Sequence, residues 1–103
     1  MDIKAVEENL EAATKMLKAL SNERRLLIVC ILHMGEQSVG ALEEMIGLSQ
    51  SALSQHLARL RRDGLVKTRR DAQTIYYSLS SGEAERILAC LHDIYCADEV
   101  ICE

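Results

Sequence analysis

Apolar side chains recur every three or four residues along most of the chain, which is the spacing of helices that bury one face. The pattern predicts an amphipathic helix over residues 3–20, further helices over 22–34 and 38–46, and a final helix over 81–96. The run LLIVCIL within 22–34 also fits a buried strand, but its length and the helix formers before it favour a central helix. Gly35 and Gly47 follow two of these helices, where glycine commonly ends a helix. The chain is therefore predicted to be mainly α.

The stretch LSQSALSQHLARLRRDGLV, residues 48–66, has the clearest helical pattern. Leucines 53, 57 and 60 form a stripe that one side of a helix would bury, and Ser49 can cap its first turn. Asp63 and Gly64 give it a stop signal, so the helix is predicted at about 49–62. Its other side carries hydroxyl, amide and guanidinium groups, which suit base edges and phosphates. With the tight turn at Gly47, residues 38–62 have the order of a helix-turn-helix motif.

Residues 65–79 follow this helix and predict a β-hairpin. They are rich in Val, Thr, Ile and Tyr, and Ile75, Tyr77 and Leu79 alternate as strand residues do. The polar residues 69–73 are expected to form the hairpin tip. A helix, a glycine and a basic hairpin in this order are typical of a winged helix-turn-helix, with the hairpin as its wing.

The distribution of charge favours a nucleic-acid partner, although the whole chain carries a net charge of −4. Between Arg59 and Arg70 there are six basic residues and one acidic residue, so one region is strongly cationic. His56 is expected either to point to DNA or to lie at the rim of the core. The predicted base readers are Gln50, Ser51, Ser54, Gln55 and His56, and the predicted phosphate or minor-groove contacts are Arg59, Arg62, Lys67, Arg69 and Arg70.

Length, composition and motifs indicate the number of domains, the location and the classes of function that are not expected. A chain of 103 residues that is 49% apolar and 27% charged predicts one domain over 1–103. It shows no secretory signal and no apolar run of the roughly 20 residues that span a membrane, so a cytoplasmic location is expected. No phosphate loop or G-x-S-x-G turn is present, which argues against an enzyme or a bound cofactor. A winged helix that binds only proteins would leave the basic cluster without a purpose.

The terminal helices, about 3–20 and 81–96, predict a homodimer. Each has a broad apolar side, and the run SSGE at 80–83 fits a capping box for the second. The small helical body offers limited surface to cover both sides, although the two helices could also complete a monomeric core. A two-fold dimer would present two reading helices to successive major grooves, about 34 Å apart. The expected target is an inverted repeat in promoter DNA.

The segments LSQSALSQHLARLRRDGLV and RRDAQTIYYSL together resemble the ArsR/SmtB family of winged-helix repressors over nearly the whole chain. Within that family, NERRLLIVCIL and LHDIYC are most similar to the branch that includes HlyU, BigR and SqrR. These segments contain Cys30 and Cys96. The resemblance implies that these two cysteines form a dithiol switch, which senses reactive sulfur species or oxidants and releases promoter DNA when modified. It leaves open whether the protein represses directly or displaces another silencer.

The metal-sensing members of the family have ligand patterns that this chain lacks. The third predicted helix has no Cys-x-Cys pair, and the last has neither Asp-x-His nor His-x-x-Glu in the zinc-sensor arrangement. No metal ligands are therefore predicted. A metal-responsive repressor with a non-standard site remains the alternative, since Cys30 and His33, and likewise His92 and Cys96, are spaced to share one side of a helix.

The residues alone predict unreactive thiols. Cys30 lies among apolar neighbours, so it is expected to be buried, and burial raises the pKa of a thiol. Cys96 is expected near a helix C-terminus, which disfavours a thiolate unless His92 or exposure compensates. In a cytoplasmic chain all four cysteines are expected to be reduced at rest. Cys90 and Cys102 receive no role.

Overall fold

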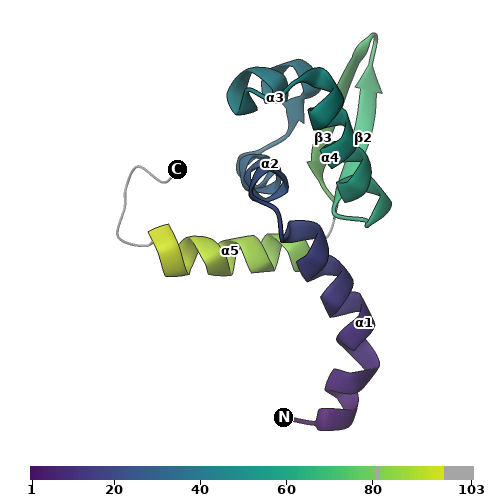
Figure 1. The fold of residues 1–103 in the computed structure, drawn as a ribbon, viewed down its shortest axis with the longest axis vertical. Coiled ribbons are helices and arrows are strands. Elements are labelled where there is room, and N and C mark those ends of the chain that lie inside the picture. The colour runs from purple at the N-terminus through teal and green to yellow at the C-terminus, as the bar shows by residue number, and fades with distance from the viewer. Residues whose placement is uncertain (81, 97–103) are drawn as a thin grey trace.

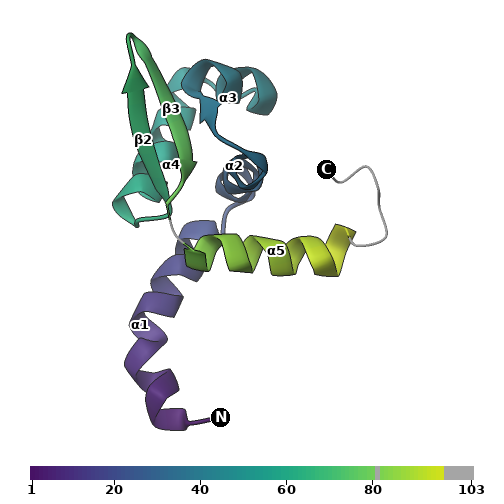
Figure 2. The same ribbon diagram turned by 180° about the vertical axis from the view of Figure 1, so that it is seen from behind.

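The computed structural model describes residues 1–80 and 82–96. In these residues the chain forms helices and a small antiparallel sheet. α2 lies at the centre, α3 and α4 pack above it with the sheet, and α1 and α5 extend from the base (Figures 1 and 2). The elements are α1 (Ile3–Leu20), α2 (Glu23–Met34), β1 (Gln37–Ser38), α3 (Val39–Ile46), α4 (Gln50–Arg62), β2 (Val66–Asp71), β3 (Thr74–Leu79) and α5 (Gly82–Cys96). This is the winged helix-turn-helix that the sequence predicts.

Side-chain caps fix where the inner helices begin. The Asn22 side chain accepts hydrogen bonds from the N–H groups of Arg24 and Arg25 at 2.9 and 3.0 Å, so Asn22 starts α2. Ser38 and Ser49 cap α3 and α4 in the same way, each at 3.1 Å. Because such a bond satisfies an N–H group that has no partner within the helix, each cap sets its helix boundary. The proposed capping box at 80–83 includes Ser81, which lies outside the described residues.

The sheet has the strand order β1-β3-β2, and its long hairpin is the wing. The prediction that residues 69–73 form the tip was wrong, because β2 continues to Asp71, which pairs with Thr74. The turn is only Ala72 and Gln73, and Ala72 adopts the left-handed φ of +56° that a two-residue hairpin turn requires. Arg69 and Arg70 are consequently strand residues held in register with Tyr76 and Ile75.

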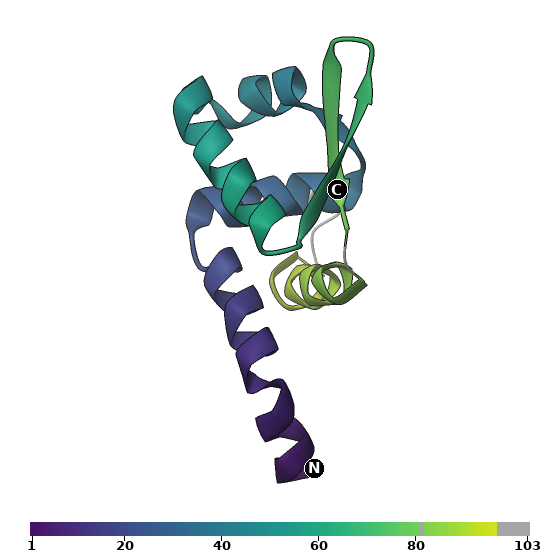
Figure 3. The same ribbon diagram turned by 90° about the vertical axis from the view of Figure 1, so that its right-hand side faces the viewer.

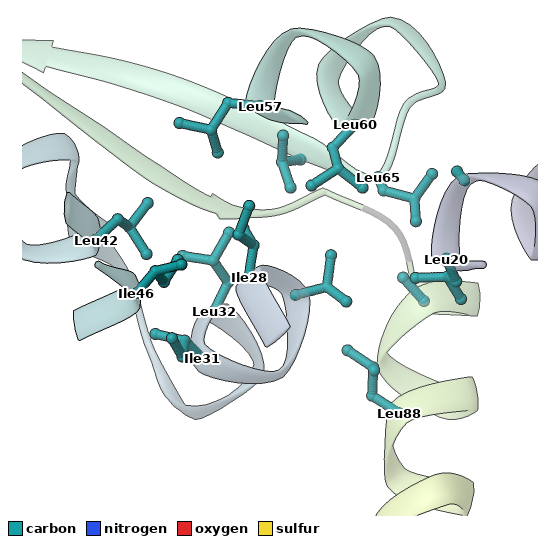
Figure 4. Close-up of a cluster of buried hydrophobic side chains, with 14 of the residues drawn as sticks. Leu20, Ile28, Ile31, Leu32, Leu42, Ile46, Leu57, Leu60, Leu65 and Leu88 are labelled. Carbon is teal, nitrogen blue, oxygen red and sulfur yellow. The ribbon is translucent and has the colours of Figure 1, made fainter. Parts of the chain in front are cut away.

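The hydrophobic core surrounds α2 and includes the leucine stripe of α4 (Figure 4). Leu53, Leu57 and Leu60 are each at most 2% exposed, as their spacing predicts. Ile28 and Val29 of α2 are fully buried beneath them. The core therefore holds α4 by one side and leaves its other side at the surface.

Each terminal helix contributes two buried residues to this core, and those of α5 are Ala84 and Leu88. Only Ala19 and Leu20 of α1 are buried, and most of α1 extends away from the body (Figures 1 and 3). Its apolar stripe is open, with Leu10 51% and Leu17 58% exposed. On α5, Ile94 is 63% exposed. A single chain therefore leaves the apolar side of α1 uncovered. No helix in the described ranges is long and apolar enough to cross a membrane.

Candidate nucleic-acid interface

The surface of α4 opposite the leucine stripe is polar and open to solvent. Ser51, Gln55 and Arg62 lie roughly on the opposite side of the helix from the buried leucines, given 3.6 residues per turn. All three are exposed, as are Gln50 and Ser54 at the start and middle of the helix. The structure thus presents the predicted base readers as one accessible strip, apart from His56.

A groove of about 500 Å³ separates this strip from the wing and is lined by Ser54, Ala58, Arg61, Arg62 and Tyr77. Arg61 is exposed here. It belongs to the basic cluster of the sequence, but the contact predictions omitted it. The helical spacing from Ser54 and Ala58 places it on the wing side and could have identified it.

His56 lies at the rim of the core, the second of the two positions expected for it. The side chain is half-buried, and burial lowers the pKa of His56, with a further contribution from the positive charge of Arg25. Arg25 is held nearby because its Nε donates to the Ala19 carbonyl oxygen at 2.7 Å. The lowered pKa of His56 disfavours the imidazolium form, which is the form that would contact a phosphate as a cation.

Asp63 binds Arg59 and Arg62, two of the predicted phosphate contacts, at the end of α4. Its carboxylate accepts hydrogen bonds from Arg59 Nε at 2.9 Å and from Arg62 Nε at 3.4 Å, and its side chain is only 5% exposed. The Arg59 hydrogen bond lowers the pKa of Asp63, against burial, which raises it; Arg62 adds to the lowering. Arg59 is therefore largely engaged, whereas Arg62 has the longer contact and the more exposed side chain.

Arg69 of the wing is paired with Glu36, which follows α2. Its Nη2 and Nε donate to the two carboxylate oxygens of Glu36 at 2.8 and 3.0 Å, and its guanidinium lies 4.3 Å from the centre of the Tyr76 ring. The hydrogen bond from Arg69 lowers the pKa of Glu36. Lys67 and Arg70 are exposed and form no ion pair within residues 1–80 and 82–96. They are the wing cations open to a phosphate.

The thiols of Cys30 and Cys96 line one cavity of about 280 Å³ between α2 and α5, in a mainly apolar setting that includes Leu88 and Leu91. The prediction that Cys30 is buried was wrong: its side chain is exposed. Ile28, Val29 and Leu32 turn one side of α2 to the core, and Cys30 lies about half a turn away from them. Partial burial in the cavity still raises the pKa of Cys30, and the nearby Cys96 raises it further.

The candidate metal ligands lie on the same cavity, which Cys30, His33, His92 and Cys96 all line. Among the described residues, however, no three His, Cys, Asp or Glu side chains are close enough to hold a metal ion. Cys90 lines a separate depression on α5 with Arg86 and Ile87. Cys102 lies outside the described residues.

Known proteins resemble this chain in both sequence and structure. The family described as "Bacterial regulatory protein, arsR family" matches residues 22–68, from the cap of α2 into the wing. The transcriptional activator HlyU of Vibrio cholerae is 54% identical over 93% of this chain and 89% of its own length.

Two solved structures extend the comparison. The transcriptional repressor BigR of Xylella fastidiosa superposes with a TM-score of 0.87, at 41% identity over 93% of this chain and 98% of its own. A homodimeric winged helix-turn-helix DNA-binding domain from Mycobacterium bovis gives a TM-score of 0.76, at 32% identity over 91% of this chain and 85% of its own. Identity at this level over nearly full length, with the same fold, places the chain in the ArsR family of bacterial regulatory proteins, as a DNA-binding transcriptional regulator and not an enzyme.

Proposed function

We propose that this chain is a homodimeric transcriptional regulator that binds an inverted-repeat promoter site when reduced and leaves it when Cys30 and Cys96 become linked. The observation that carries the proposal is that the two thiols share one cavity between α2 and α5. α2 is the centre of the core, whereas α5 belongs to the terminal part of the fold. A link between the thiols would therefore constrain a terminal helix relative to the DNA-reading body. The proposed site of action is the cytoplasm.

The proposed dimer covers the apolar sides of α1 and α5 with a second copy. In one chain Leu10, Leu17 and Ile94 are each more than half exposed, which is costly for a surface that stays in water. A homodimeric relative of the same fold supports a second copy as the partner. Two-fold symmetry would place both copies of α4 on one side of the duplex, about 34 Å apart.

The proposed switch is a pair of thiol exchange steps with a disulfide or polysulfide as oxidant. The Cys30 thiolate attacks one sulfur of the oxidant, and the other sulfur leaves as a thiolate. The Cys96 thiolate then attacks the Cys30 sulfur and releases the second thiolate, so two thiols become one disulfide and the oxidant gains two electrons. The two protons of the thiols pass to solvent or to the leaving thiolates. The bond ties α2 to α5 and changes the spacing between the two reading helices of the dimer.

The regulatory outcome of DNA release and the identity of the inducer each have an alternative. HlyU is described as an activator and BigR as a repressor, so release from DNA could end repression or end displacement of another silencer. Zinc is the alternative inducer, because two histidines line the thiol cavity. Repression and displacement of a silencer differ in what the bound protein does, whereas polysulfide and zinc differ in what ends DNA binding.

The test is promoter affinity before and after each inducer. A binding site is selected from a random duplex pool with the reduced protein, and the Kd is measured again after polysulfide, hydrogen peroxide or zinc. We expect polysulfide to weaken binding at least about tenfold, the effect of a coupling free energy of about 1.4 kcal/mol. Mass spectrometry should then find the Cys30 and Cys96 peptides joined. Release by zinc alone, or release with both thiols unmodified, would contradict the proposal.

The proposed DNA contacts predict that two substitutions change DNA binding in different ways. Lys67→Ala should weaken binding to all sequences and reduce the slope of log K against log salt by about 0.9, because one phosphate contact is lost. Gln55→Ala should keep that slope and lose discrimination at one base pair by about 1–3 kcal/mol. Fluorescence anisotropy on matched and single-mismatch duplexes at several salt concentrations separates them. Lys4→Ala, at the far end of α1, is the control and should change neither quantity.

A further inference from the structure

A hydrogen bond between α2 and α5 fixes the orientation of a histidine that lines the thiol cavity. Nδ1 of His33 lies 2.8 Å from Oε2 of Glu85 and joins α2 to α5. An ionised carboxylate can only accept a hydrogen bond, so Nδ1 must carry the proton. The lone pair of the neutral ring is then on Nε2. His33 also lines the cavity that holds Cys30 and Cys96, and Glu85 thus fixes which nitrogen of a cavity-lining ring can accept a proton.

We propose that His33, oriented by Glu85, is the base that deprotonates Cys30 and so sets the reactivity of the thiol pair. Cys30 and His33 are three residues apart on α2, a spacing that brings two side chains to the same side of a helix. The use of this thiolate in releasing DNA rests on the proposed function, whereas the activation of the thiol does not.

The thiol needs such a base because its surroundings work against ionisation. Partial burial raises the pKa of Cys30, and Cys96 raises it further, so little thiolate forms without help. In the proposed step the S–H bond of Cys30 breaks, the electron pair stays on sulfur, and the proton moves to Nε2 of His33. The resulting imidazolium lies between the thiolate and the carboxylate of Glu85, and both negative charges stabilise it.

Other titratable groups face the same cavity and could compete for this role. They are His92, Tyr95 and Cys96, all on α5. Among the described residues, none forms an ion pair or side-chain hydrogen bond with His92, so nothing fixes the orientation of its ring. The carboxylate partner distinguishes His33 from His92, and His92 is therefore the matched control.

The test is the rate at which Cys30 is alkylated by iodoacetamide, followed by mass spectrometry of its peptide in the full chain without DNA. In this reaction the thiolate forms a carbon–sulfur bond and iodide leaves. We expect His33→Gln to slow alkylation about tenfold at pH 7 and to move the pH profile about one unit higher, the equivalent of one pKa unit. Glu85→Gln should give a smaller loss, because its neutral amide no longer balances the imidazolium. His92→Gln should match the unmodified protein.

A second measurement separates activation from structural damage. On the high-pH plateau of each variant's profile the thiol is ionised without a base, so all variants should reach the same maximal rate if the fold is intact. A lower rate for His33→Gln at every pH would show that the substitution disturbs packing and would overturn the proposal, as would an unchanged rate at pH 7. Promoter release by polysulfide is measured separately. If polysulfide does not release the wild-type protein from promoter DNA but His33→Gln still slows alkylation, the proposed function is wrong. The proposal that His33 is the base for Cys30 would still hold.

Discussion

Replacing Leu10 and Leu17 with glutamate is expected to produce a folded monomer that binds an inverted-repeat site at least a hundredfold more weakly. Both side chains lie on the open stripe of α1 and are half exposed in a single chain. Full burial of a leucine contributes about 1.5–3 kcal/mol, so covering the exposed half of each contributes about 1 kcal/mol. Two leucines from each protomer then give about 4 kcal/mol, or roughly a thousandfold in the dimer dissociation constant. Burying a glutamate instead adds a further desolvation penalty.

The fold should survive this substitution, because neither leucine belongs to the core around α2. The measurements are sedimentation equilibrium, the midpoint of thermal unfolding, and anisotropy with full-site and half-site duplexes. The half-site should be bound as before, because α4 and the wing are unchanged. Ala5→Glu with Ala12→Glu adds the same charge to exposed positions on another side of α1 and is the matched control. A variant at Leu10 and Leu17 that stays dimeric would show that α1 is not the interface.

Cys30→Ser and Cys96→Ser should each bind promoter DNA as tightly as the unmodified protein and remain bound after polysulfide. Cys30 is exposed and Cys96 lies in the last turn of α5, so serine at either position should cost little stability. Without two thiols the second exchange step has no attacking group or no target, and α2 and α5 stay unlinked. The expected change in Kd on treatment is less than about twofold, against at least about tenfold for wild type.

Cys90→Ser provides the control for loss of a thiol. Cys90 is an exposed thiol on the same helix but lines a different depression, so this variant should still release DNA. The informative measurement is anisotropy of the labelled promoter before and after treatment, with non-reducing mass spectrometry of the same samples. A double variant at Cys30 and Cys96 that still releases DNA would rule out the switch.

Helical spacing was sufficient to predict the elements that hold the site. The stripe at Leu53, Leu57 and Leu60 has a clear period, and the serine and glycine residues around it fix both ends of α4. β1 was not predicted, because two residues carry no period and Ser38 already serves as a helix cap. The hairpin tip was misplaced because polar residues signal a turn as readily as an exposed strand.

The candidate site was harder to predict, since it depends on which side of an element a residue occupies. Cys30 lies in an apolar run, yet the core takes only one side of α2 and leaves the thiol on the other. Arg59 and Arg69 count toward a basic cluster, but each is paired with a carboxylate that only the tertiary structure or the helix end brings near. Charge in a sequence gives the sign of a surface and not the number of cations available to a ligand.

The pairing of Arg69 with Glu36 has a consequence for how the protein searches a genome. The Glu36 carboxylate occupies the guanidinium of Arg69 with two oxygens, as a phosphate would, so in the proposed complex Arg69 would have to leave Glu36 before it could donate to a DNA phosphate. A phosphate of random duplex only replaces the Glu36 carboxylate, so this exchange adds little net attraction. In the proposed complex, a matched site adds base contacts along α4 that hold the wing close to the DNA backbone. For the proposed regulator we therefore expect Glu36 to lower the attraction to bulk DNA more than to the operator, and so to shorten the time that the protein spends on wrong sequences.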